Sequence, residues 1–218
     1  MTAEVQPSIA RRKQPLRVLA LLDSLERALV ARVTLRLIHE LSYLANVLAP
    51  VFELAPQSAS LLKRRGGPYY PEMQRTLDLL VGKGMVFAFD LQYVHVPEET
   101  RYRLDARYEL NRALAQPPIE RYRQIYSDTD EIVFIDQLAL AYSTLADEQL
   151  GRATPYDARY AHSDVDVNNV IDFGEWVPET RANFSANAAL TFAPDLQLRP
   201  SERLYLYIAH LKKRALSA

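Results

Sequence analysis

Residues 63–110 read KRRGGPYYPEMQRTLDLLVGKGMVFAFDLQYVHVPEETRYRLDARYEL, and their pattern defines the architecture of the chain. The first part predicts a helix over 71–81, because apolar residues recur there at helical spacing. These residues are Met73, Leu77, Leu80 and Val81. Proline at the start suits a first helical turn, where its missing N–H would have no partner in any case. The following Gly82-Lys83-Gly84 gives the chain the freedom to leave the helix.

Two runs of alternating residues follow, over 85–96 and 101–110. In the second run the even positions are apolar or aromatic and the odd positions are charged, which predicts a strand with one buried and one wet face. The even positions are Tyr102, Leu104, Ala106, Tyr108 and Leu110. Pro97-Glu98-Glu99-Thr100 is the turn between the strands, and its glutamates would repel phosphate if the hairpin reached toward DNA.

Two amphipathic helices precede this stretch. One begins at Pro15, with leucines repeating at helical spacing, and the other is capped by Thr34 and runs to about Ala49. Pro50 ends the second helix because proline cannot continue the hydrogen-bond ladder. We expect the following residues, 51–62, to be a connector with a short helix at its end, over 58–62.

Two helices, a third helix and then a hairpin are the pattern of a winged-helix domain. We assign this N-terminal winged-helix domain to residues 15–112 and expect residues 1–14 to be a flexible N-terminus. A winged helix is a docking unit for DNA or for another protein and is seldom a catalytic scaffold. The helix over 71–81 is then the candidate recognition helix.

The second half of the chain is predicted to be helical. Residues 111–118 have the composition of a linker, and residues 119–218 form a C-terminal helical region packed on the first domain. The expected helices cover 119–126, 130–149, 181–192 and 199–216, with an aspartate-rich irregular segment over 154–177. The predicted fold class is therefore α+β and mainly helical.

Composition narrows the function classes. The chain has 218 residues, 49% of them hydrophobic, which supports a packed core and argues against disorder. It has no cysteine, so disulfides and thiolate metal sites are excluded. The 26 basic and 27 acidic residues give a net charge of -1, whereas proteins that bind DNA alone usually have a basic surplus. We find no secretory signal and no long apolar run, and we expect a cytoplasmic protein that does not bind a membrane.

Local basic residues still make DNA contact a hypothesis. Lys63-Arg64-Arg65 precedes the candidate recognition helix, and Gln74 and Arg75 lie on it. Lysine and arginine there could neutralise phosphates, while Gln74 or Arg75 could read base edges. Arg101 and Arg103 of the hairpin complete the candidate set. Alternatively, these side chains belong to a solvated loop or pair with nearby carboxylates.

Residues 164–175 have the ligand spacing of a calcium-binding EF-hand loop. With the first aspartate at position 1, oxygen-bearing side chains occupy positions 3, 5, 9 and 12, and the last is a glutamate that can chelate with both oxygens. The candidate metal ligands are Asp164, Asp166, Asn168, Asp172 and Glu175. Position 6 is Asn169 instead of glycine, and Pro178 interrupts the exiting helix. The alternative is an acidic loop whose side chains bond to local backbone.

The sequence contains no motif for catalysis. The histidines lack the spacing of a zinc-binding HExxH, and no GxSxG nucleophile motif occurs. The glycines after Arg65 are not followed by the rest of a phosphate-binding loop. We therefore expect a protein that is not an enzyme and has no cofactor. Candidate partner contacts are the aromatic residues Tyr69, Tyr70 and Trp176.

The segment 41–86, from LSYLANVLAP to VGKGMV, resembles two groups of bacterial proteins. One is the Panacea domain of antitoxins, in which a helix ending near Tyr43-Leu44-Ala45 is followed by a Gly-Pro turn and a winged helix. The other is the small middle component of ABC-three-component systems, operons that pair an ABC/SMC-like ATPase with an effector. The pattern VIDFGEW at 170–176, followed by 183–189, is more similar to the second group.

The resemblance implies an adaptor subunit of an anti-phage or anti-plasmid defence complex. The protein partners of such a subunit would be an SMC-like ATPase and an effector encoded nearby. The resemblance implies no active-site residue in this chain. The alternative function is a DNA-binding transcriptional regulator or antitoxin that would use Lys63-Arg64-Arg65 and the helix over 71–81. A third hypothesis, a calcium-dependent or hydrolytic enzyme, depends on residues 164–175 alone.

Overall fold

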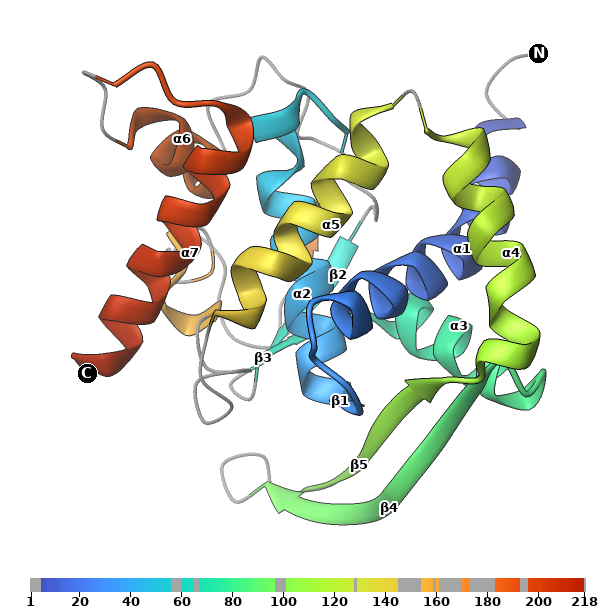
Figure 1. Ribbon diagram of the computed structural model, residues 1–218. Helices are drawn as coiled ribbons and strands as arrows, with labels where there is room; N and C mark the ends of the chain where they lie inside the picture. The colour runs from blue at the N-terminus through green and yellow to red at the C-terminus, as the bar shows by residue number, and fades with distance from the viewer. Residues whose placement is uncertain are drawn as a thin grey trace.

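The computed structural model describes residues 5–55, 60–64, 67–96, 101–127, 129–144, 154–158, 160, 170–172, 183–192 and 196–217. This part of the chain is mainly helical and contains two small antiparallel sheets (Figure 1). One cluster of buried side chains runs from Val18 in the first helix to Leu211 in the last. A long hairpin projects from one side of the helices, as Figure 1 shows.

The first helix, α1 (Val5–Arg27), is longer than expected. We predicted its start at Pro15, after a flexible segment over 1–14, but the helix begins at Val5 and Pro15 lies inside it. Because proline has no backbone N–H, one bond of the helical ladder is missing at that residue. Every residue from Val18 to Leu25 is buried, so the second half of α1 lies against the core.

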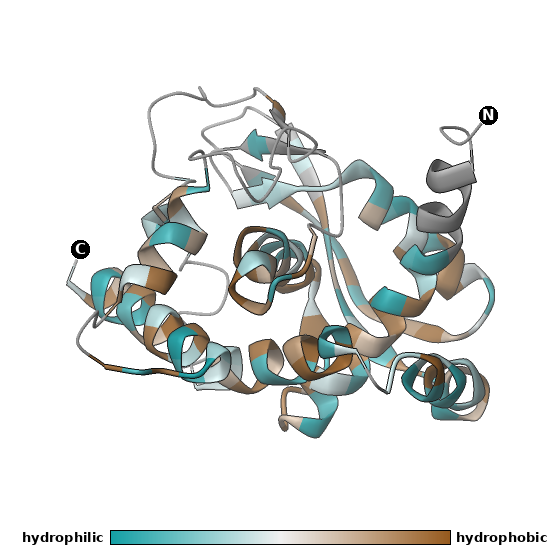
Figure 2. Ribbon diagram, turned by 90° about the horizontal axis from the view of Figure 1, so that it is seen from above, coloured by the Kyte–Doolittle hydropathy of each residue, from teal (hydrophilic) through white to brown (hydrophobic). Residues whose placement is uncertain are grey.

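The second helix, α2 (Leu35–Leu48), is central. Thr34 caps it as predicted, because its hydroxyl accepts a hydrogen bond from the Leu37 N–H at 3.2 Å. Every residue of α2 except Arg36 is buried, and Figure 2 shows this helix near the middle of the molecule with other elements around it. Its end continues into a short 3-10 helix, η1 (Ala49–Phe52).

The predicted helix and hairpin are confirmed. The helix α3 (Pro71–Gly82) is followed by β4 (Val86–Val96) and β5 (Arg101–Leu110), which pair antiparallel. Gly84 lies between α3 and β4 and turns the chain there with a φ of 68°, a conformation that favours glycine. A third strand, β1 (Val33–Thr34), lies beside β5, so the sheet order is β1-β5-β4.

A second sheet occupies the place of the predicted connector. We expected a short helix at 58–62, but β2 (Ser60–Arg64) is a strand that pairs antiparallel with β3 (Gly67–Tyr69). On its other side β2 pairs with β6 (Val170–Asp172), which comes from the second half of the chain. A short apolar run fits either a helix or a strand, and here pairing with β3 on one side and with the distant β6 on the other makes it a strand.

The expected linker is a helix. Residues 111–118 were predicted to separate the two halves, but α4 (Arg112–Ile125) runs continuously through Pro117 and Pro118. Buried residues on both sides of it belong to the same hydrophobic core. The two halves are therefore joined by packing as well as by the chain.

The C-terminal region consists of α5 (Asp130–Ser143), α6 (Phe184–Thr191) and α7 (Pro200–Leu216), with the short 3-10 helix η3 (Thr154–Tyr156) between the first two. We expected the first of these helices to reach Gln149, but it ends at Ser143 and residues 145–149 lie outside the described part. α5 packs against α1 and against α7, which brings the two ends of the chain to opposite sides of one helix.

Candidate functional site

Lys63, the first residue of the basic run 63–65, is buried and cannot contact a nucleic acid. This residue lies on β2 and is 8% exposed, and its Nζ stands 5.5 Å from the ring centre of Tyr160. An ammonium group buried against a ring stabilises the fold and does not meet a phosphate in solvent. This corrects the expectation that Lys63 contacts nucleic acid. The side chains of Arg64, Arg65, Arg101 and Arg103 lie outside the described residues.

Gln74 is engaged inside the protein as well. The Tyr70 N–H donates to His39 Nδ1 at 3.3 Å, so we assign the imidazole proton to Nε2, which lies 3.4 Å from Gln74 Oε1. The amide nitrogen of Gln74 donates to Asp78 at 2.8 Å. The Gln74 side chain thus links α3 to α2 instead of facing a base edge, whereas Arg75 is exposed.

Among the candidate partner contacts, Tyr70 belongs to the core. It is 2% exposed, and its hydroxyl accepts a hydrogen bond from Asn46 at 2.8 Å. Burial raises the pKa of Tyr70 well above its ordinary value. A partner cannot reach this ring, which corrects the expectation. Tyr69 is half-buried beside His39, with 5.1 Å between the ring centres, and Trp176 lies outside the described residues.

The calcium-like segment is described only at β6. The backbone of Asp172 pairs there with Ser60 of β2. The other candidate ligands, Asp164, Asp166, Asn168 and Glu175, and the side chain of Asp172 lie outside the described residues. In the part of the chain that the structure does describe, no three His, Asp or Glu side chains are grouped so that they could hold a metal ion.

The apolar face of the hairpin extends beyond the core. The even positions of β5 are buried over 106–110, half-buried at Leu104 and 70% exposed at Tyr102. Residues two apart on a strand lie on one face, so this face starts inside the protein and ends in solvent. β4 places Tyr93, which is 75% exposed, opposite Leu104 and places His95 opposite Tyr102. We call these four side chains, Tyr93, His95, Tyr102 and Leu104, the overhang.

Two side chains of the overhang contact each other. The ring centres of His95 and Tyr102 lie 5.2 Å apart at an angle of 60°. The alternation of β5 predicted that all its even positions would be buried, and this is wrong at Tyr102 because the helices cover only the near half of the hairpin. Exposed aromatic groups gathered on one face are typical of interaction surfaces.

The base of the hairpin is fixed to the helices. Glu26 of α1 accepts a hydrogen bond from the Leu110 N–H at 3.0 Å, and its other oxygen accepts from Arg112 Nη2 at 2.6 Å. The Asn111 N–H donates to the carbonyl of Met85 at 2.9 Å, which ties the two strands together where they leave the core. The base of the hairpin is thus tied to α1, and its two strands are tied to each other there.

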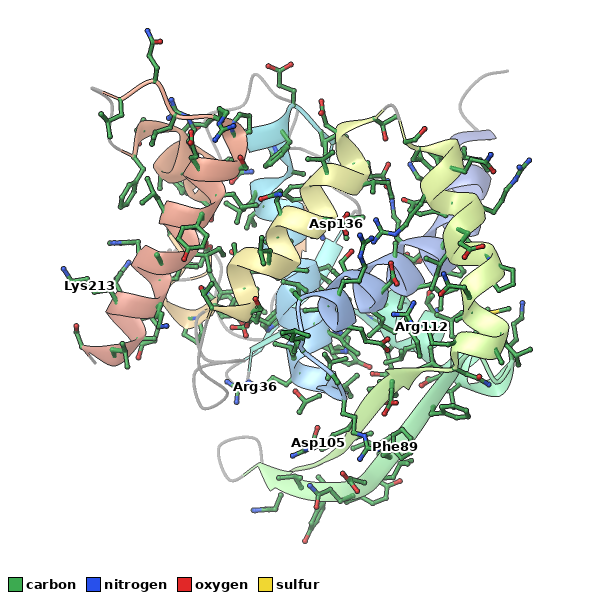
Figure 3. The ribbon with its side chains drawn as sticks, viewed as in Figure 1. Arg36, Phe89, Asp105, Arg112, Asp136 and Lys213 are labelled. Atoms are coloured by element: carbon green, nitrogen blue, oxygen red, sulfur yellow. The ribbon has the colours of Figure 1, made fainter. Side chains whose placement is uncertain are left out.

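A network of ion pairs joins α1, α4 and α5 next to this base. Arg112 Nη1 lies 2.6 Å from Asp23, and the guanidinium of Arg123 contacts both Asp23 and Asp136 at 2.8 Å. Figure 3 labels Arg112 and Asp136, which lie at the two ends of this network. Burial raises the pKa of Asp136, but the hydrogen bonds from Arg123 and Ser24 lower it more, so the net shift is downward.

A buried carboxylate connects the C-terminal helices to α2. Asp157 has no exposed surface and accepts hydrogen bonds from the hydroxyls of Tyr43, Ser185 and Tyr207 at 2.5, 2.7 and 2.7 Å. Burial, and then the charge of Asp157, raises the pKa of both Tyr43 and Tyr207, so the phenols keep their protons. Groups that bond to one another in a closed site are typical of a structural network.

No protein-family model and no curated protein matches this chain. Where the structure describes helices, none combines the length and the apolar character that crossing a bilayer requires. The function is therefore argued from the surfaces described above. Among the described residues, the overhang carries the two most exposed tyrosines, Tyr93 and Tyr102.

Proposed function

We propose that this chain is a non-enzymatic adaptor that holds protein partners together. The observation that carries this proposal is the overhang, since its tyrosines are 75% and 70% exposed on a hairpin whose base is tied to α1. Tyrosine is enriched at protein interfaces because it offers a large ring and a hydrogen-bonding hydroxyl at low entropic cost. The order of two helices, a third helix and a hairpin supports assigning residues 15–112 to a winged-helix domain.

The partners that we propose are an SMC-like ATPase and an effector encoded beside this chain, in a cytoplasmic anti-phage or anti-plasmid defence complex. The resemblance of segment 41–86 to middle components of ABC-three-component systems supports this choice. The C-terminal helices add a second surface, because α7 carries Tyr205 at 48% exposure on the far side of α5. A chain with two separate surfaces on one core suits the bridging of two proteins.

DNA binding by a winged-helix regulator or antitoxin is the weaker proposal. Arg75 is exposed on α3 beside the hairpin, and this favours it. Against it, Lys63 is buried, Gln74 bonds to Asp78, and the net charge is -1. A gel-shift assay with a salt titration separates the two proposals, because phosphate contacts give a steep loss of affinity with salt.

Co-purification tests the adaptor role. The full chain is expressed with the proteins encoded beside it, and the complex is isolated through a tag on this chain. We expect the double variant Tyr93→Ser and Tyr102→Ser to lose one partner while it keeps its fold. The matched control is Tyr205→Ser, which removes an exposed tyrosine from α7 and should keep that partner. Recovery of the wild-type chain alone, without any co-expressed protein, would count against the proposal.

A further inference from the structure

β4 is the last strand of its sheet. In the order β1-β5-β4 it has a neighbour on one side, and within the described residues no strand lies on the other. The free side of an edge strand carries a row of backbone N–H and C=O groups that can pair with another strand. Natural proteins usually protect such an edge with charges, prolines or a bulge.

Protection of β4 is confined to its middle. The register shifts between Phe89 and Gln92, and Asp90 has a φ of 52° there, which is a bulge with a charge on it. Beyond the bulge the strand continues as QYVHV over 92–96, without proline and without any Asp, Glu, Lys or Arg. β5 differs, since charged residues alternate along its whole length.

We propose that segment 92–96 pairs with the same segment of a second copy of this chain. The strands would run antiparallel and centre on Val94, the middle residue of the segment between the bulge and the turn. In this register Val94 faces Val94 of the second copy, and Tyr93 faces His95 of the second copy. Within 92–96 no two like charges oppose one another, and neighbouring aromatic side chains across strands stabilise the pair.

The dimer joins the two overhangs. Tyr93 and His95 lie on the same face as Leu104 and Tyr102, so the paired sheets form one continuous aromatic face across a two-fold axis. The segment is uncharged and therefore neither repels its own copy nor attracts phosphate, which favours a second copy over DNA as the occupant. Five residues from each copy bury less than the roughly 1,200 Å² of a standard interface, so we expect a weak, micromolar dimer. This inference does not depend on the adaptor role.

Cross-linking tests the register, because the chain has no cysteine of its own. In the proposed dimer, Val94→Cys brings two Cα atoms to about 5 Å, within the range for a disulfide. Gln92→Cys should not cross-link, since position 92 faces position 96 and its own copy is about 13 Å away along the strand. Leu29→Cys, at a residue that is 93% exposed after α1, controls for random collisions.

Sedimentation of the full chain tests the pairing without a cross-link. We expect Val94→Lys to weaken self-association about tenfold, because two like charges would meet at the two-fold axis. Val94→Thr keeps a β-branched, neutral side chain and should associate like the wild type. The proposal is supported if Val94→Cys cross-links while the other two cysteine variants do not, and if Val94→Lys weakens self-association. A wild-type chain that stays monomeric at high micromolar concentration, or equal cross-linking of all three cysteine variants, overturns it.

Discussion

Tyr43 and Tyr207 are buried among the helices and donate their hydroxyls to Asp157, whereas Tyr93 and Tyr102 on the hairpin are 75% and 70% exposed. The same side chain thus has two uses in one molecule. A buried ring removes a large apolar area from water and its hydroxyl needs a partner, so it stabilises the fold. An exposed ring contributes little to folding and is free to contact another molecule. The helices should therefore carry the stability, and the far end of the hairpin should carry the binding.

The strongest test of this comparison uses two tyrosines of β5. Tyr108 and Tyr102 are on the same strand and the same face, but Tyr108 is 4% exposed and Tyr102 is 70% exposed. We expect Tyr108→Ala to lower the free energy of unfolding by about 3–5 kcal/mol, because it leaves a cavity in the core. Tyr102→Ala should change it by less than about 0.5 kcal/mol. Urea unfolding of both variants measures the difference, and equal losses would contradict the division of the hairpin into two halves.

Asp157 gives the next largest effect. We expect Asp157→Asn to cost about 2–4 kcal/mol, since an amide NH₂ would face hydroxyl donors that now point at a carboxylate. The matched control is Asp90→Asn, the same substitution at the exposed bulge of β4, where asparagine tolerates the positive φ of 52°. The control should stay within about 0.5 kcal/mol of the wild type. A similar cost at both positions would mean that the buried cluster does not hold the C-terminal helices.

Glu26 connects the two regions and should have an intermediate effect. Glu26→Ala removes the acceptor for the Leu110 N–H and the partner of Arg112, and we expect a loss of about 1–2 kcal/mol. Amide hydrogen exchange at Leu110 should become faster in this variant. Glu109→Ala removes an ion pair with Arg32 whose side chains are 59% and 35% exposed, and it should cost less than about 0.5 kcal/mol. Unchanged exchange at Leu110 would show that the hairpin base is held by other contacts.

Sequence patterns predicted the helices and strands that are determined by residues close together in the chain. The helix at 71–82 and the hairpin after it follow from periodicity and from glycine and proline positions, and the Thr34 cap follows from residue type alone. The strand β2 was missed because a short apolar run fits a helix as well as a strand, and because one of its two partners, β6, is far away in the sequence. The helix through Pro117 and Pro118 was read as a linker, since the ion pairs that hold α4 to α1 are formed only in the fold.

The sequence predicted which residues share the apolar face of the hairpin. It did not predict which of these side chains are exposed to solvent. The alternation of β5 identified the apolar face correctly, but it gave no sign of where the helices stop covering that face, at Leu104. Lys63 and Tyr70 illustrate the reverse error. A basic run and an aromatic pair suggested surface contacts, but strand β2 and the contacts of His39 and Asn46 bring both residues inside. Burial depends on three-dimensional packing, which a local pattern does not contain.

The smallest expected effect depends on pH and concerns the contact between α1 and α5. Glu131 accepts hydrogen bonds from Lys13 at 2.5 Å, from Tyr122 at 2.6 Å and from Arg17 at 2.8 Å. Burial raises the pKa of Glu131, but these bonds and the charge of Arg17 lower it more, so the net shift is downward. The unfolded chain, with a glutamate pKa of about 4.3, therefore takes up the proton first as the pH falls. The contribution of Glu131 is fully present above about pH 5 and is lost as the pH falls below about 4.

Glu131→Gln should flatten this pH dependence. Between pH 6 and pH 3 we expect the wild type to lose about 1 kcal/mol more stability than the variant, measured by urea unfolding at each pH. The control is Glu120→Gln on the exposed side of α4, whose curve should follow that of the wild type. A curve for Glu131→Gln that fell as steeply as that of the wild type would show that these hydrogen bonds do not set the acid sensitivity of the contact between α1 and α5.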